Sequence, residues 1–241
     1  IILPDLMDRY HITAPDMGQF SGLYYLGYAG MHVPLGLMLD RWGPRIVLSG
    51  CLAACVVGMV PLLVAETWMY PCLGRFLVGV GSSSAILGVF KMIRLYFPDA
   101  WFSRLLGLSV TLGLVGAIYG GQPVRHLLVT FGWQATLFGF ITVGIILALI
   151  FWILVPRHIQ DEQETFSFVK SLKVLCFNKK LWFLSVLSGL MVGPLEGFAD
   201  VWGPLFLKHV YSMDGDQAVQ LPSFIFLGMC VGCPILPWLA Q

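Results

Sequence analysis

Two long apolar runs joined by a short charged segment constrain this chain more than any other feature. Residues 17–39 and 46–65 contain no Asp, Glu, Lys or Arg. Each run is close to the roughly 20 residues that an α-helix needs to cross a bilayer. Because so few residues join them, the two helices must be antiparallel neighbours, and the charges of residues 36–45 must lie together at one membrane face.

The rest of the chain has the same character. Hydrophobic residues make up 58% of the 241 residues and charged residues 11%, whereas a soluble domain has about 25% charged residues. The fold class is therefore an all-α membrane protein, and the net charge of +1 predicts no nucleic-acid partner. Five further spans are predicted, which makes seven: residues 69–90, 105–128, 134–155, 181–207 and 218–240.

Lys and Arg gather on one side of the predicted spans. Ten of the fourteen lie in the connections around residues 40–45, 91–104 and 156–180. Because cytoplasmic loops carry the excess of Lys and Arg, these connections are predicted to be cytoplasmic, as in a bacterial inner (plasma) membrane. The second part of the connection 156–180 is amphipathic. A helix lying on anionic headgroups and a plain linker with a basic end both fit it.

The charged hairpin resembles the signature loop after the second span of the major facilitator superfamily. It matches at Gly36, Met38, Asp40, Arg41, Gly43 and Arg45. Arg75, Gly79 and Gly81 are similar to the fourth-span motif of the family, and residues 131–138 to the turn before its sixth span. The resemblance implies a secondary transporter rather than an enzyme, with two parallel six-helix repeats and alternating access.

The fifth-span antiporter motif of the family is matched only in part. Gly116, Gly120 and Gly121 fit, but Ala117 stands where the motif has proline, and Leu112 replaces its first glycine. This departure favours uptake over export. The small residues of the stretch are also expected to bring helices close together.

An internal repeat predicts how the chain is organised. A shift of 201 residues aligns Tyr10 with Tyr211 and Gly27 with Gly228. We therefore expect a fragment that holds spans two to eight of twelve. Residues 1–155 would form most of the N-terminal half, 156–180 a cytoplasmic linker, and 181–241 the start of the C-terminal half.

The hairpin charges have a mechanical role in the family, and the resemblance implies the same role here. Asp40 would latch the cytoplasmic side shut against the positive end of a helix in the other half. Its predicted partners are Arg41, Arg45 and Arg94. The alternative is that these are topology charges only, which explains the arginines but not Asp40.

Two carboxylates lie inside a predicted span, where ionisable groups are costly and are therefore functional candidates. Glu196 and Asp200 are four residues apart, and Pro194 and Pro204 flank them and allow a bend. In the family that the hairpin resembles, this span lines the central cavity, which implies that the pair faces the substrate and carries protons. The alternative is a structural pair near the outer interface.

Arg75 lies about two turns inside its span and needs an anionic partner. That partner is either a substrate carboxylate or phosphate, or a carboxylate of a span outside this sequence. His32, with Tyr28 one turn earlier, is a proton shuttle or a plain hydrogen-bonded histidine. Gln122 is expected to reach the outer vestibule.

These features predict proton-coupled symport of a small polar, possibly anionic, metabolite by a monomer in the lipid bilayer. No cofactor and no metal are expected, and the proton gradient is the driving force. A proton-driven exporter of drugs or metabolites remains open, as does a non-transporting sensor of the same fold. A membrane-embedded enzyme would need clustered His, Asp or Ser at one depth, and the sequence has no such cluster.

Overall fold

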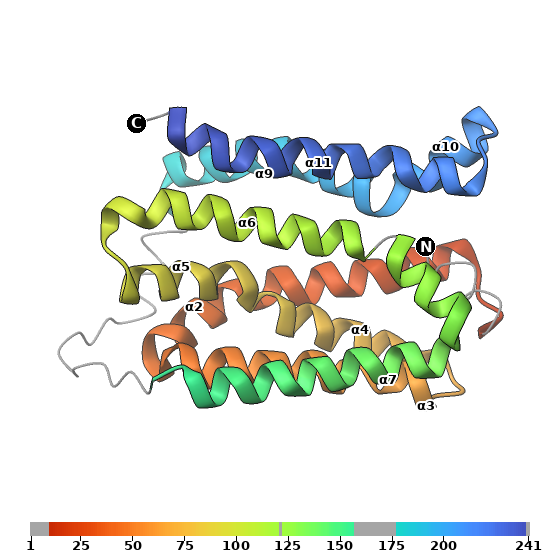
Figure 1. Ribbon diagram of the computed structural model, residues 1–241, viewed down its shortest axis with the longest axis horizontal. Coiled ribbons are helices and arrows are strands. Elements are labelled where there is room, and N and C mark those ends of the chain that lie inside the picture. Colours follow the sequence, from red (N-terminus) through yellow and green to blue (C-terminus); the bar gives the residue numbers. More distant parts are fainter. Residues whose placement is uncertain (1–9, 121, 157–176, 240–241) are drawn as a thin grey trace. The chain divides into compact units, whose positions relative to one another are not determined.

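The structure, a computed structural model, describes residues 10–120, 122–156 and 177–239. These residues form helices joined by short turns, and no β-strand occurs among them (Figure 1). The predicted all-α class is therefore confirmed. By its contacts the chain divides into two units, one of Ile1–Leu106 with Val124–Gln160 and one of Gly107–Pro123 with Asp161–Gln241.

The first unit begins with the predicted hairpin. Helix α2 (Ala14–Met59) consists of two arms that reverse direction at Gly43, where φ is 77° and ψ is 165° (Figure 1). Only glycine adopts this backbone region readily, and Pro44 follows at once, with a φ suited to the start of the second arm. The short helix α3 (Pro61–Val64) ends the second apolar run.

The third run, predicted as the span 69–90, lies in one membrane-crossing candidate, Met69–Tyr96, which is divided at one residue. Helix α4 (Met69–Ser82) and helix α5 (Ser84–Tyr96) meet at Ser83. The hydroxyls of Ser82, Ser83 and Ser84 lie 3.2, 2.7 and 2.9 Å from the carbonyl oxygens three residues earlier. Such bonds back to the preceding turn bend helices, which explains the junction.

Helix α4 packs closely against both arms of α2. A Cβ atom at Gly79 would collide with the carbonyl oxygen of Tyr24 in the first arm, and one at Gly81 with that of Cys51 in the second. The missing side chains thus let three backbones approach, as small residues do between helices in lipid. The hydrophobic core of the hairpin consists of Leu35, Leu39, Val47, Leu48 and Cys51.

The boundary after the fourth predicted run differs from the prediction. A short 3₁₀ helix, η1 (Asp99–Trp101), leads into α6 (Phe102–Tyr119). We predicted a span over residues 105–128, but α6 ends at Tyr119 because Gly120 and Pro123 stop one helix and start the next.

Helix α7 (Gln122–Leu154) then turns sharply at Gly132, with φ 79° and ψ 169°. Its second arm corresponds to the span predicted at residues 134–155.

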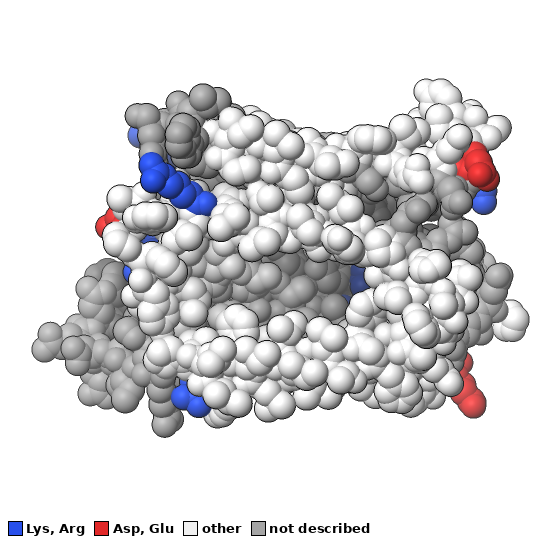
Figure 2. Space-filling model, in the orientation of Figure 1, with Lys and Arg blue, Asp and Glu red and all other residues white. Residues whose placement is uncertain are grey.

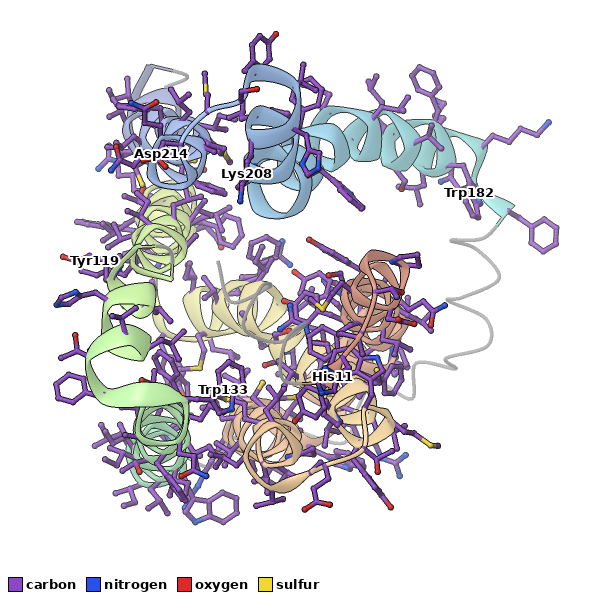
Figure 3. The ribbon with its side chains drawn as sticks, turned by 90° about the vertical axis from the view of Figure 1, so that its right-hand side faces the viewer. His11, Tyr119, Trp133, Trp182, Lys208 and Asp214 are labelled. Carbon is purple, nitrogen blue, oxygen red and sulfur yellow. The ribbon has the colours of Figure 1, made fainter. Side chains whose placement is uncertain are left out.

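The second unit contains most of α6 and the chain beyond residue 176. Helix α9 (Lys179–Glu196) continues into a π-helical turn, η2 (Gly197–Trp202), and then α10 (Gly203–Tyr211). The predicted span 181–207 is thus interrupted by a π-helical segment between Pro194 and Pro204. Helix α11 (Gly215–Leu239) lies beside α6, where Cys230 Sγ is 3.9 Å from the carbonyl oxygen of Thr111 (Figure 3).

Five helices of the described part are long and apolar enough to cross a membrane, and α11 holds a shorter apolar stretch, Gln220–Ile235. The first candidate, Pro15–Val64, contains both arms of the hairpin and so corresponds to two of the predicted spans. Charged side chains gather near the helix ends, and the visible helix middles are largely uncharged (Figure 2). The protein is thus a multi-pass membrane protein. The amphipathic stretch expected within 156–180 lies outside the described residues.

Candidate functional site

The first arm of α2 carries a row of aromatic side chains at four-residue intervals. Phe20, Tyr24, Tyr28 and His32 share one face because four α-helical residues turn the chain by about 400°, only 40° more than one full turn. The ring centroids of Tyr24 and Tyr28 are 6.0 Å apart, and those of Tyr28 and His32 are 4.5 Å apart in an edge-to-face arrangement. The row therefore continues as a ring-to-ring contact from Tyr24 to His32.

Arg75 of α4 lies over the first two rings of this row. Its guanidinium carbon is 4.7 Å from the ring centroid of Tyr24 and 5.3 Å from that of Phe20. The Nε atom is buried and has no hydrogen-bond partner. Among the residues that the structure describes, no carboxylate lies within ion-pair distance of Arg75. Ring faces thus supply the attraction for this charge within the unit.

Tyr24 also connects two turns of α4. Its hydroxyl is hydrogen-bonded to Ser82 Oγ at 3.0 Å, while its ring lies beneath Arg75. The sequence pattern did not reveal this bridge, because Tyr24 and Ser82 are far apart along the chain. The motif glycine Gly79, between Arg75 and Ser82, was the only signal for a close approach at this point.

His32 and Tyr28 are brought together as the sequence suggested. The Nδ1 atom of His32 is 2.7 Å from the carbonyl oxygen of Tyr28. A carbonyl oxygen only accepts, so the geometry assigns the hydrogen to Nδ1. The other ring nitrogen, Nε2, is then the atom that can take up a proton.

At the hairpin turn, the structure changes the predicted partners of Asp40. The Asp40 carboxylate pairs with Lys91 of α5, at 2.8 Å from Oδ1 to Nζ. In the described part of the chain, neither Arg41, Arg45 nor Arg94 pairs with it, so those predicted ion pairs are corrected. Lys91 was recognised only as one of the cytoplasmic cations, because nothing in its spacing connects it to Asp40.

The predicted gate arginines have other surroundings. The guanidinium of Arg45 lies 4.8 Å from the ring centroid of Trp152 at the end of α7, with its Nε buried and without a hydrogen-bond partner. Arg94 lies 5.4 Å from the ring centroid of Phe102. Arg41 is exposed. Arg45 thus attaches the hairpin end to α7 through an aromatic ring, and Arg94 attaches α5 to the start of α6 in the same way.

The opposite end of the same unit is held by Trp133, which belongs to the motif at residues 131–138 that resembles the turn before the sixth span of the family. It follows the kink at Gly132, and its indole Nε1 donates to the carbonyl oxygen of Leu62 at 3.0 Å. Figure 3 shows it on the side of α7 that faces the other helices of this unit. It belongs to an apolar cluster with Phe20, which is one of the two rings that Arg75 contacts.

Three predicted site residues have side chains outside the described part. Glu196 is the last residue of α9, Asp200 lies in the π-helical turn η2, and Gln122 begins α7. Gly36 lies in the first arm of α2, where an added Cβ would meet no atom within 4 Å. The same is true of Gly116, so no close helix approach occurs there among the described residues. No group of three or more His, Cys, Asp or Glu in the described residues could hold a metal ion.

The whole chain, residues 1–241, matches the sequence model of the Major Facilitator Superfamily. The chain belongs to the Major Facilitator Superfamily. This confirms the resemblance inferred from the hairpin and assigns the described helices to the all-α fold of that family.

Relatives with curated names agree. The chain is 27% identical to the uncharacterized transporter YybO of Bacillus subtilis (strain 168), over 89% of this chain and 53% of the relative. It is 24% identical to the hexuronate transporter of the same organism, over 72% and 40%. It is 22% identical to the probable L-galactonate transporter of Escherichia coli (strain K12), over 98% and 56%.

The chain spans about half the length of the curated relatives it matches. These relatives are named as transporters, which confirms the prediction that the chain is not an enzyme.

Proposed function

We propose that this superfamily member takes up a small anionic metabolite by alternating access, as a proton-coupled symporter. The observation that carries the proposal is Arg75. It keeps its charge within an apolar span, its Nε has no hydrogen-bond partner, and no described carboxylate pairs with it. An intramembrane cation of this kind is a functional candidate, and the planar guanidinium fork suits a carboxylate.

The names of two relatives support the same substrate class. Hexuronates and galactonate are sugar acids, and each carries one carboxylate on a polar body. Carboxylate recognition by Arg75, with the side chains of Tyr28 and His32 further along the row, would suit such a molecule. The proposed setting is a bacterial inner membrane, with the full-length protein as a monomer and without a cofactor.

The substrate test uses the full-length protein reconstituted in liposomes. We expect uptake of radiolabelled D-galacturonate and much less of neutral D-galactose. Arg75→Gln should lower kcat/KM for D-galacturonate by about 10- to 100-fold, since hydrogen bonds to charged groups contribute about 1.5–3 kcal/mol. Arg104→Gln, a change of the same kind at an exposed position, is the control. Equal uptake of both sugars, or an unaffected Arg75→Gln protein, would refute the anionic substrate.

Proton coupling has a separate test. Each proton that enters down 100 mV supplies roughly 2.3 kcal/mol, enough to accumulate a substrate. The candidate carriers are Nε2 of His32 and the carboxylates of Glu196 and Asp200. Collapse of the pH gradient should abolish accumulation but leave exchange intact. Accumulation unchanged in Glu196→Gln would remove that residue from the mechanism, and efflux of hydrophobic drugs without metabolite uptake would favour the exporter.

A further inference from the structure

We infer that Tyr24 positions the guanidinium of Arg75, and that Ser82 fixes Tyr24 for this task. The first contact is ring to cation, at 4.7 Å, and the second is hydroxyl to hydroxyl, at 3.0 Å. Neither Tyr24 nor Ser82 was part of the predicted site. The consequence for transport rests on the proposed function, whereas the contact itself can be measured without it.

Gly79 makes this arrangement possible. Arg75 and Ser82 are seven residues apart on α4, which separates them by about 10 Å along the helix axis. Gly79 lies between them, and the backbone of Tyr24 approaches it so closely that a side chain there would collide with the Tyr24 carbonyl oxygen. The Tyr24 side chain therefore starts midway between the two, with its ring beneath Arg75 and its hydroxyl at Ser82.

A free arginine side chain would be a poor anion receptor. It carries about 2 kcal/mol of rotamer entropy, part of which is lost whenever it binds. A ring beneath the guanidinium fixes the plane of the guanidinium before the substrate binds. The N–H groups at the edge of the guanidinium remain available for a carboxylate. The hydroxyl bond to Ser82 keeps that ring from turning.

The three consecutive serines provide a matched control. Only Ser82 bonds to Tyr24, whereas the hydroxyl of Ser83 donates to the Val80 carbonyl oxygen of its own helix at 2.7 Å. Ser82→Ala and Ser83→Ala make the same chemical change at adjacent positions. Only the first should release Tyr24, and Ser82→Thr, which keeps a hydroxyl, should restore the parent behaviour.

The first experiment measures how firmly Arg75 is held. The full-length protein in detergent is treated with phenylglyoxal, and modification of Arg75 is followed by mass spectrometry, with exposed Arg94 as the internal standard. Tyr24→Leu and Ser82→Ala should raise the Arg75 rate by about threefold or more relative to Arg94, with Tyr24→Phe close to Ser82→Ala. If Tyr24→Leu does not fold, the two milder variants carry the test. Rates equal to that of Ser83→Ala in all of them would overturn the inference.

The second experiment measures transport. Ser82→Ala and Tyr24→Phe should raise KM for D-galacturonate about three- to tenfold with kcat within twofold, and the double variant should be no worse than either, because both remove one contact. Additive effects, or altered labelling with an unchanged KM, would overturn the positioning role. If the parent protein carries no carboxylate at all, the proposed function fails, and the labelling result still decides whether Tyr24 and Ser82 hold Arg75.

Discussion

Lys91 Nζ lies 2.8 Å from Asp40 Oδ1, so the hairpin carboxylate is joined to α5 and not to an arginine of its own loop. The Asp40 side chain is 66% exposed and that of Lys91 21%. The pair therefore joins the turn of α2 to α5 at one end of the first unit, in a place where solvent screens its attraction.

The ion pair should contribute little to stability. Exposed pairs contribute about 0.2–1 kcal/mol, so Asp40→Asn and Lys91→Gln should each lower the free energy of unfolding by no more than that. The exchanged pair, Asp40→Lys with Lys91→Asp, should restore it. Thermal unfolding of the purified full-length protein at low and high salt provides the measurement.

Transport should respond differently to the same exchange. The family resemblance implies that the Asp40 carboxylate also meets the positive end of a helix in the other half. We therefore expect D-galacturonate uptake to stay low in the exchanged protein although its stability returns. Full recovery of uptake would show that the Asp40–Lys91 pair is itself the functional contact.

The two sharp turns within α2 and α7 should not tolerate a side chain. At Gly43 and Gly132 the backbone has φ near 78° and ψ near 167°, values that other residues avoid. Gly43→Ala and Gly132→Ala should each cost about 1–3 kcal/mol in the free energy of unfolding. Gly50→Ala, in an open helical position where an added Cβ meets nothing within 4 Å, should be neutral or slightly stabilising. A Gly43→Ala protein as stable as Gly50→Ala would contradict this account of the turn.

The packing contact between α2 and α4 should be equally sensitive to an added side chain. Gly79→Ala places a methyl group against the Tyr24 carbonyl oxygen, and such overpacking costs about 1–3 kcal/mol. Gly30→Ala, on the same arm as Tyr24 but with no atom within 4 Å of an added Cβ, is the control. Unfolding midpoints in detergent should fall for the first change and not for the second.

The contact between Arg45 and Trp152 should depend on the ring and not on the indole nitrogen. A cation over an aromatic face is worth about 0.5–2 kcal/mol, depending on how far it is removed from water. Trp152→Leu should therefore lower the unfolding midpoint, and Trp152→Phe should lower it less. A Trp152→Phe protein as unstable as Trp152→Leu would indicate that the size of the side chain matters and not its ring.

The sequence was sufficient for the fold wherever one physical constraint dominated. The absence of charge over residues 17–39 and 46–65 left no arrangement but an antiparallel hairpin, and the structure has it. The ends of the spans depend on local backbone chemistry that hydropathy does not measure. Thus α6 stops at Tyr119 within an apolar run, because Gly120 and Pro123 break the helix there, and three serine hydroxyls divide the third run at Ser83.

For the candidate site, the sequence predicted individual residues but not the contacts between them. Arg75 and His32 stood out because polar groups are costly inside a bilayer. Their partners did not, because contacts such as Tyr24 with Ser82 or Asp40 with Lys91 depend on how deeply one helix approaches another. The distance of approach is set by glycines such as Gly79. The sequence motif identifies these glycines but not the residues that pack against them.

The reversal at Gly43 also limits where foreign peptide can be placed in this protein. Residue 43 joins the two arms directly, so an epitope or protease site inserted beside it would have to displace one helix. The connection between α5 and α6 is different, since the side chains of residues 97–101 are all exposed. Reporter insertions for mapping which side of the bilayer the charged end faces therefore belong at residues 98–100.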